Sequence, residues 1–192
     1  MFVGEEKGYQ AVVIGSSAGG LHALKTIFES LDGKFPLPVI VVQHMSPDAD
    51  DYLATFLNSM KKIRVKEADE KEIPKAGVAY IAPPNYHLLM EHDGSFTLTI
   101  GERVNYARPS VDVLFETAAE FYGEDLIGII LTGANNDGSL GLKKIKEHGG
   151  LTIVQDPNEA ESDTMPRTAL EMAKPDHVLT LKEIANFLNS LI

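Results

Sequence analysis

The sequence predicts an α/β fold with three layers, in which a mostly parallel, doubly wound sheet carries helices on both faces. Residues 11–14, 37–44 and 126–131 form short, continuous apolar runs rich in β-branched side chains. Runs of this kind are typical of strands buried on both faces. Segments with apolar residues at helical spacing, such as residues 21–31 and 111–122, alternate with these runs. This alternation indicates parallel strands joined by helical crossovers.

The first third of the chain reads as two strand–helix units. After a lead-in over residues 1–9, one domain is expected to span residues 10–192. A strand over 11–14 runs through a glycine-rich turn into a helix over 21–31. A second strand over 37–44 is followed by Ser46, Pro47 and Asp48, a combination that predicts a helix over about 48–60. A brief strand is expected at 63–65.

The middle of the chain predicts a β-hairpin insertion at one edge of the sheet. A strand over 78–82 is stopped by two prolines, and strands over 87–90 and 95–100 flank a His-Asp-Gly turn. The rest returns to strand–helix alternation. Helices are expected over 111–122, 140–148, 165–173 and 181–192, and strands over 126–131, 151–154 and 177–179.

Composition excludes several classes of protein. The chain of 192 residues has no cysteine, which removes disulfides, thiolate nucleophiles and cysteine metal sites and fits a reducing cytoplasm. A net charge of −11 argues against a general binder of nucleic acid or anionic membrane. No apolar run approaches the ~20 residues that span a bilayer, and the start does not resemble a signal peptide. We therefore expect a cytoplasmic protein without direct membrane insertion.

The turn after the first strand is the first candidate for chemistry. Its sequence GSSAG fits G-x-S-x-G, a motif that lifts a serine hydroxyl above a sheet edge, and the serine is Ser17. Two other interpretations remain open for the turn alone. It could be a phosphate-binding loop, although its spacing matches neither common glycine motif, or Ser17 could simply cap the helix.

Three predicted strands end in loops that carry Ser17, His44 and Asp137. Sites in such sheets form outside the carboxyl ends of the strands. These are the residue types of a hydrolytic triad, in which an imidazole takes the serine proton and a carboxylate fixes the imidazole tautomer. Each also has a structural interpretation: a hydrogen-bonded histidine at a strand end, or an aspartate in a turn. A metal site at His44, Asp48, Asp50 and Asp51 lacks supporting spacing, and His87 and His92 are expected on the surface of the hairpin.

Several segments together resemble one family. They are IGSSAGG, VVQHM, RPSVDVLF (108–115), ILTGANNDGSLGL (130–142) and MPRTA (165–169), and in this order they resemble the catalytic domain of chemotaxis protein-glutamate methylesterases of the CheB type. The resemblance covers about residues 10–190. It implies a parallel α/β domain with Ser17 as nucleophile, His44 as general base and Asp137 as orienting carboxylate.

The resemblance also implies a reaction and partners. The family hydrolyses glutamate methyl esters on chemoreceptors, releases methanol, and deamidates glutamines; neither cofactor nor metal is expected. Backbone N–H groups near Ala18 and Ala134 would hold the oxyanion, and Arg108 would meet the receptor or form a surface salt bridge. Three residues in two loops depart from the family pattern: Ala18 replaces a threonine, and Ala134-Asn135 replaces Met-Gly.

These departures leave two alternatives, an esterase or amidase acting on another carboxyl substrate and a non-catalytic binding module. Typical members also have an N-terminal receiver domain, whereas nine residues precede the first predicted strand here. We therefore expect a stand-alone catalytic domain with its site open to solvent and any control coming from a separate regulatory protein. The sequence leaves the oligomeric state open.

Overall fold

A seven-stranded parallel sheet forms the centre of the molecule. The computed structural model describes residues 8–191. The strand order is β3-β4-β2-β1-β7-β8-β9, and every pairing in this sheet is parallel. The strands are β1 (Ala11–Ser16), β2 (Val39–Gln43), β3 (Arg64–Glu67), β4 (Val78–Ile81), β7 (Leu126–Ile130), β8 (Leu151–Gln155) and β9 (His177–Leu179). The predicted parallel sheet is confirmed.

The strands at the centre of the sheet are the ones with the most apolar sequences. Every residue of β1, β2 and β7 is buried. β1 lies between the other two, and Val13 is paired with Ile40 on one side and Gly128 on the other. Gly128 has no side chain because a Cβ there would lie 2.6 Å from Ile145 Cδ1, so α4 packs directly on the strand backbone.

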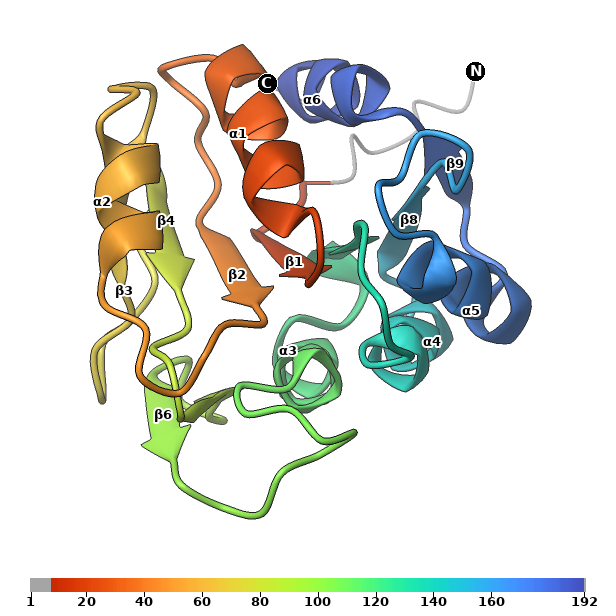
Figure 1. Ribbon diagram of the computed structural model, residues 1–192. Helices are drawn as coiled ribbons and strands as arrows, with labels where there is room; N and C mark the ends of the chain where they lie inside the picture. Colours follow the sequence, from red (N-terminus) through yellow and green to blue (C-terminus); the bar gives the residue numbers. More distant parts are fainter. Residues whose placement is uncertain (1–7, 192) are drawn as a thin grey trace, which may run out of the picture.

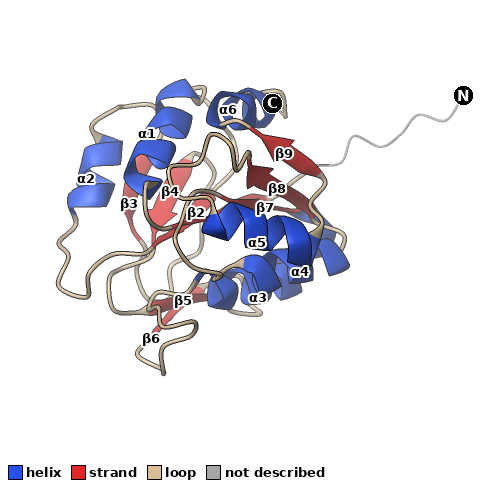
Figure 2. Cartoon of the chain, turned by 45° about the vertical axis from the view of Figure 1, so that its right-hand side comes forward, coloured by secondary structure: helices blue, strands red, loops and turns tan. Residues whose placement is uncertain are grey.

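Helices cover both faces of the sheet and complete the three layers (Figure 1). One face carries α1 (Gly20–Ser30), α2 (Tyr52–Asn58) and α6 (Leu181–Asn189), and the other carries α3 (Val111–Tyr122), α4 (Ser139–Glu147) and α5 (Thr164–Ala173). A 3-10 turn, η1 (Gly123–Asp125), connects α3 to β7. Two apolar cores result, one on each face, and Figure 2 shows the sheet between them.

The predicted hairpin is a separate two-stranded sheet. β5 (His87–Met90) and β6 (Phe96–Thr99) pair antiparallel, and Figure 2 shows them beside α3, away from α1. Met90 N donates to Thr117 Oγ1 of α3 at 3.1 Å. The Phe96 ring meets Tyr80 of β4 edge-on, with ring centroids 5.2 Å apart. The hairpin therefore extends the α3 face of the molecule.

The bounds of one helix differ from the prediction. The helix expected over residues 48–60 is α2, which begins only at Tyr52 and ends at Asn58. The segment before it forms turns instead: Asp48 N donates to Ser46 Oγ at 3.4 Å, and Tyr52 N donates to Asp50 Oδ1 at 3.1 Å. These polar side chains compete for backbone N–H groups that a helix would use. The Ser-Pro-Asp signal therefore marks a turn.

Most of the predicted lead-in over residues 1–9 lies outside the described residues, of which Gly8 and Tyr9 are the first. In the described part of the chain, none of the helices has the length and apolar character needed to cross a bilayer.

Candidate active site

Three neighbouring strands deliver Ser17, His44 and Asp137 to one edge of the sheet. Ser17 and His44 directly follow β1 and β2, and Asp137 lies in the loop between β7 and α4. The Ser17 N–H donates to Thr132 O at 2.9 Å, and the His44 N–H donates to Ser16 O at 3.0 Å, so the loops continue the ladder beyond the strands. The predicted placement at the carboxyl edge is what the structure shows; the catalytic roles stay predictions.

Gln43 ties the serine loop to the histidine loop. Its Nε2 donates to Ser17 O at 2.9 Å and to His44 O at 2.8 Å, while its Oε1 accepts from Ser16 Oγ at 2.7 Å. A Cβ at Gly20 would lie 1.8 Å from Gln43 Oε1, so the first residue of α1 must be glycine for this bridge to form. Gly20, directly after the G-x-S-x-G motif, thus makes room for the Gln43 side chain, which holds the backbones of both loops.

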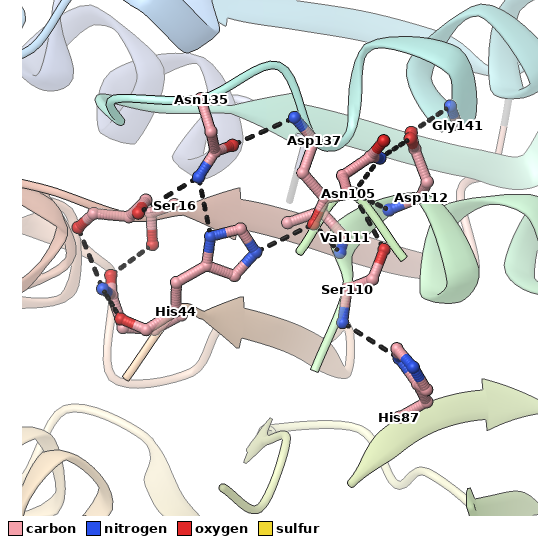
Figure 3. Close-up of polar contacts among 12 residues, drawn as sticks. Ser16, His44, His87, Asn105, Ser110, Val111, Asp112, Asn135, Asp137 and Gly141 are labelled. Carbon is pink, nitrogen blue, oxygen red and sulfur yellow. Dashed lines mark hydrogen bonds and ion pairs between the residues drawn. The ribbon is translucent and has the colours of Figure 1, made fainter. Parts of the chain in front are cut away.

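His44 contacts Asp137 through its Nε2 atom. The distance from Nε2 to Asp137 Oδ2 is 2.8 Å, the His44 side chain is 12% exposed, and the Asp137 side chain is fully buried. A carboxylate oxygen can only accept, so Nε2 carries the proton and Nδ1 keeps its lone pair. Nδ1, the atom that a general base for Ser17 would use, therefore faces the side chain of Asn135 (Figure 3).

Asp137 is held by donors from the start of α3 and the loop before it. Besides His44, its two oxygens accept from Asn105 Nδ2, Ser110 Oγ and the backbone N–H groups of Val111 and Asp112. Burial alone would raise the pKa of the Asp137 carboxyl, but these hydrogen bonds outweigh it and hold the pKa below its usual value. The carboxyl is therefore ionised, and it can stabilise the positive charge that the predicted triad places on His44.

A second buried carboxyl, Asp112, lies beside Asp137. Asn105 Nδ2 donates to Asp112 Oδ2 at 2.7 Å and to Asp137 Oδ1 at 3.0 Å, and Gly141 N donates to Asp112 Oδ1 at 2.7 Å. Burial, together with the Asp137 charge, raises the pKa of Asp112 to about 6 against the opposing hydrogen bonds. Both carboxyls thus depend on one amide from the loop over residues 101–110, where Asn105 has a φ of +50°.

His87 is buried, which corrects the prediction of a surface residue. Its exposed fraction is 3%, because β5 packs against α3 and not into solvent. Its Nδ1 accepts from Ser110 N at 3.2 Å, so its Nε2 carries the proton and donates to Glu102 O at 2.8 Å. His87 therefore connects both ends of the loop that carries Asn105. The other hairpin histidine, His92, is exposed as expected.

Arg108 organises the same loop. Its guanidinium donates to Asn85 Oδ1, at 2.7 and 3.1 Å, and to the carbonyls of Ile100 and Gly101, each at 2.8 Å. It is half-buried and lines a cavity of about 330 Å³ that also reaches Ser17 and His44. Arg108 thus shapes the wall of the cavity; a contact with a receptor stays a prediction.

The predicted oxyanion donors lie beside the serine. Within residues 8–191, the backbone N–H groups of Ala18 and Ala134 have no hydrogen-bond partner, and both residues are exposed. Gly133, which precedes Ala134, packs closely against Met165 and Ser17, since a Cβ there would lie 1.9 Å from Met165 Sδ and 2.9 Å from Ser17 Cβ. Two free donors next to a serine can bind the oxygen of a tetrahedral intermediate.

Sequence reasoning missed the residues that support His44 and Asp137. Asn135 Nδ2 lies 3.0 Å from His44 Nδ1 and 3.5 Å from Ser17 Oγ. Its position in the Asp137 loop drew attention only as a departure from a family pattern. Asn105 lies in no recognisable motif, and Asp112 belonged to the 108–115 segment without an assigned role; the packing of the 101–110 loop against α3 brings them together.

Comparisons with known proteins agree with this geometry. A family model described as CheB methylesterase matches residues 12–188. A relative from Leptospira interrogans is 55% identical over 177 residues, which cover 92% of each chain. A protein-glutamate methylesterase/protein-glutamine glutaminase from Archaeoglobus fulgidus is 41% identical over 91% of this chain and 51% of its own length.

The fold matches a solved structure equally well. The crystal structure of the Thermotoga maritima CheB methylesterase catalytic domain superposes with a TM-score of 0.91 at 38% identity, covering 96% of this chain and all of that one. The family model spans nearly all of the sheet and both helical layers. On the strength of the matched residues and the matched fold, the chain belongs to the CheB methylesterase family.

Proposed function

We propose that this chain is a serine hydrolase that demethylates glutamate methyl esters on the signalling domain of methylated chemoreceptors. It releases methanol and also deamidates receptor glutamines. Family membership and the names of the relatives support the substrate class. The observation that carries the chemistry is the orientation of His44, whose protonated Nε2 meets a buried carboxylate, while its unprotonated Nδ1 lies 3.0 Å from the Asn135 amide, which in turn lies 3.5 Å from Ser17 Oγ. We expect the reaction to occur in the cytoplasm, where the receptor's signalling region lies.

The first half of the reaction acylates the enzyme. Ser17 Oγ attacks the ester carbonyl while its proton passes to His44 Nδ1, and the negative charge moves to the carbonyl oxygen. The free N–H groups of Ala18 and Ala134 hold that oxygen, and Asp137 balances the imidazolium. The tetrahedral intermediate then collapses. The C–O bond to the methoxy group breaks, His44 returns its proton to that oxygen, and methanol leaves.

The second half regenerates the enzyme. A water molecule gives its proton to His44 Nδ1 and attacks the acyl carbon, and the resulting intermediate expels Ser17 Oγ, which takes the proton back. The product is a free glutamate side chain. Glutamine deamidation follows the same steps with ammonia as the leaving group. Asp112 and Asn105 take no proton in this scheme; they hold Asp137 in place.

Release of methanol from a methylated receptor fragment tests the proposal. We expect Ser17→Ala and His44→Ala each to slow release by orders of magnitude, with little further loss in the double variant because the two residues act as a unit. Ser46→Ala is the matched control, since Ser46 is an exposed serine of the loop after β2. Equal release by the wild type and Ser17→Ala would refute the nucleophile.

A further inference from the structure

Asn135 occupies the space between the serine and the base. The residue is half-buried and lines the same cavity as Ser17 and His44. Its Oδ1 accepts from the backbone N–H of Asp137 at 3.0 Å, and this contact decides which end of the amide is the oxygen. The NH₂ end therefore points at Ser17 and His44, which Figure 3 shows for His44.

The amide of Asn135 uses the lone pair that Ser17 needs. A neutral imidazole has one in-plane lone pair, and in His44 it lies on Nδ1 because Nε2–H is donated to Asp137. Asn135 Nδ2 donates to this lone pair at 3.0 Å. Across residues 8–191 no hydrogen bond joins Ser17 to His44 directly; the only polar neighbour that Ser17 Oγ has is the same Asn135 amide, at 3.5 Å. The base is therefore occupied in the resting site.

We propose that Asn135 is a positioning residue that caps His44 in the free enzyme and is displaced when an ester enters the cavity. The cap holds the tautomer that the reaction requires and at the same time withholds the base from Ser17. Displacement exchanges one N–H···N hydrogen bond for the O–H···N bond from Ser17, so no charge moves until the ester is attacked. The inference rests on the proposed serine hydrolase function.

Two variants separate the donor of Asn135 from its acceptor. Asn135→Ser keeps a short oxygen that can accept from the Asp137 N–H, as serine does in turns, but it cannot reach His44. Asn135→Asp keeps the acceptor as well, but it places a carboxylate oxygen opposite Nδ1 where the wild type has a donor. A carboxylate there favours a proton on Nδ1, which removes the base.

The experiment measures how fast a neutral fluorophosphonate labels Ser17. We expect Asn135→Ser to be labelled about 3- to 10-fold faster than the wild type, the factor that corresponds to removing one neutral hydrogen bond. We expect Asn135→Asp to be labelled at least ~10-fold more slowly. The nitrogen-15 spectrum of the His44 ring should show an unprotonated Nδ1 in the wild type and a protonated Nδ1 in Asn135→Asp. Asn136→Asp is the control, because it makes the same charge change at an exposed neighbour, and it should match the wild type.

Either variant alone decides the matter. Asn135→Ser labelled at the wild-type rate or more slowly overturns the cap, the slower result favouring an amide that binds the oxyanion. Asn135→Asp that is labelled at the wild-type rate and has an unprotonated Nδ1 also overturns the cap. If Asn135→Ser fails to fold, the result for Asn135→Asp is the one that tests the proposal. Failure of the wild type to label at Ser17 refutes the serine hydrolase itself, which is a different outcome.

Discussion

Both carboxylate oxygens of Asp137 face hydrogen-bond donors. Substitution by asparagine therefore removes a charge and also places an NH₂ group against these donors. Oδ1 accepts three hydrogen bonds and Oδ2 accepts two. In Asp137→Asn an NH₂ group must face two or three of these donors. We expect kcat to fall roughly 10³- to 10⁴-fold, because His44 is left in the wrong tautomer. We also expect the free energy of unfolding to fall by about 1–3 kcal/mol.

Ester hydrolysis and urea unfolding of Asp137→Asn test both expectations. Asp125→Asn is a suitable control, since Asp125 accepts one side-chain hydrogen bond, from Gln10, at an exposed site. Wild-type turnover in Asp137→Asn would show that the carboxylate does not orient His44.

Asp112 makes stability depend on pH in a defined window. Its pKa is raised from 3.8 to about 6 in the folded protein, so the folded state binds more protons than the unfolded state between these values. The stabilisation is fully present below pH ~4 and is lost as the pH rises through ~6, amounting to about 3 kcal/mol. The lowered pKa of Asp137 acts in the opposite sense, because its contribution is lost as the pH falls below ~4.

Urea unfolding of the wild type and Asp112→Asn at pH 4 and pH 7 isolates this group. The wild type should lose stability relative to Asp112→Asn between the two pH values, because the amide does not titrate. A constant difference between the two proteins would contradict the raised pKa.

Residue types at strand ends were enough to locate Ser17, His44 and Asp137, because a parallel sheet brings its carboxyl ends together. The side chains between them were not predictable in this way. The contact of Asn135 with His44 depends on one loop conformation. Asn105 reaches Asp137 from the 101–110 segment, which His87 and Arg108 hold through hydrogen bonds. Such contacts join segments that are far apart in the sequence, and no apolar periodicity or motif predicts that these segments meet.

At the scale of elements, Gln43 is the link between the ends of β1 and β2. Gln43→Ala removes its bonds to Ser17 O, His44 O and Ser16 Oγ and leaves a buried hydroxyl unpaired. We expect the free energy of unfolding to fall by about 1–3 kcal/mol. We also expect kcat to fall about 10- to 100-fold, since small displacements of a nucleophile relative to its base are costly.

Gln10→Ala is the matched control for Gln43→Ala. Gln10 precedes β1 at the opposite edge of the sheet, and among residues 8–191 its side chain bonds only to Asp125. Thermal unfolding and ester hydrolysis should be near wild type for Gln10→Ala. Unchanged turnover in Gln43→Ala would show that the two loops hold their geometry without the bridge.

The buried strands were the most predictable elements. β1, β2 and β7 coincide with the continuous apolar runs, and their observed bounds fall within two residues of those expected. The start of α2 was wrong by four residues, because Ser46 and Asp50 satisfy turn N–H groups that the periodic pattern assigned to a helix. Polar residues near the start of a helix thus make its first residue hard to predict from the sequence, whereas a central strand buried on both faces is marked by its continuous apolar residues.

At the scale of the molecule, the net charge of −11 predicts how the rate depends on salt. An acidic receptor fragment is repelled by an acidic enzyme, and added salt screens that repulsion over a Debye length of ~10 Å at 0.1 M. We expect kcat/KM for an acidic methylated fragment to rise between ~20 and ~200 mM salt. A small neutral methyl ester should show no change. A falling rate for the acidic fragment would indicate a local basic surface that attracts it.

The position of β1 between β2 and β7 has a consequence for how the protein is made. Residues 10 and 125, at the starts of the β1 and β7 segments, are 115 positions apart in the chain and are in contact in the fold. A ribosome adding ~5–20 residues per second therefore exposes Ser17 and His44 roughly 5–25 s before Asp137. Parallel pairing across so long a loop is also slow to nucleate. The predicted triad is therefore incomplete until Asp137 has been synthesised, and we expect hydrolysis to start only once the centre of the sheet has closed.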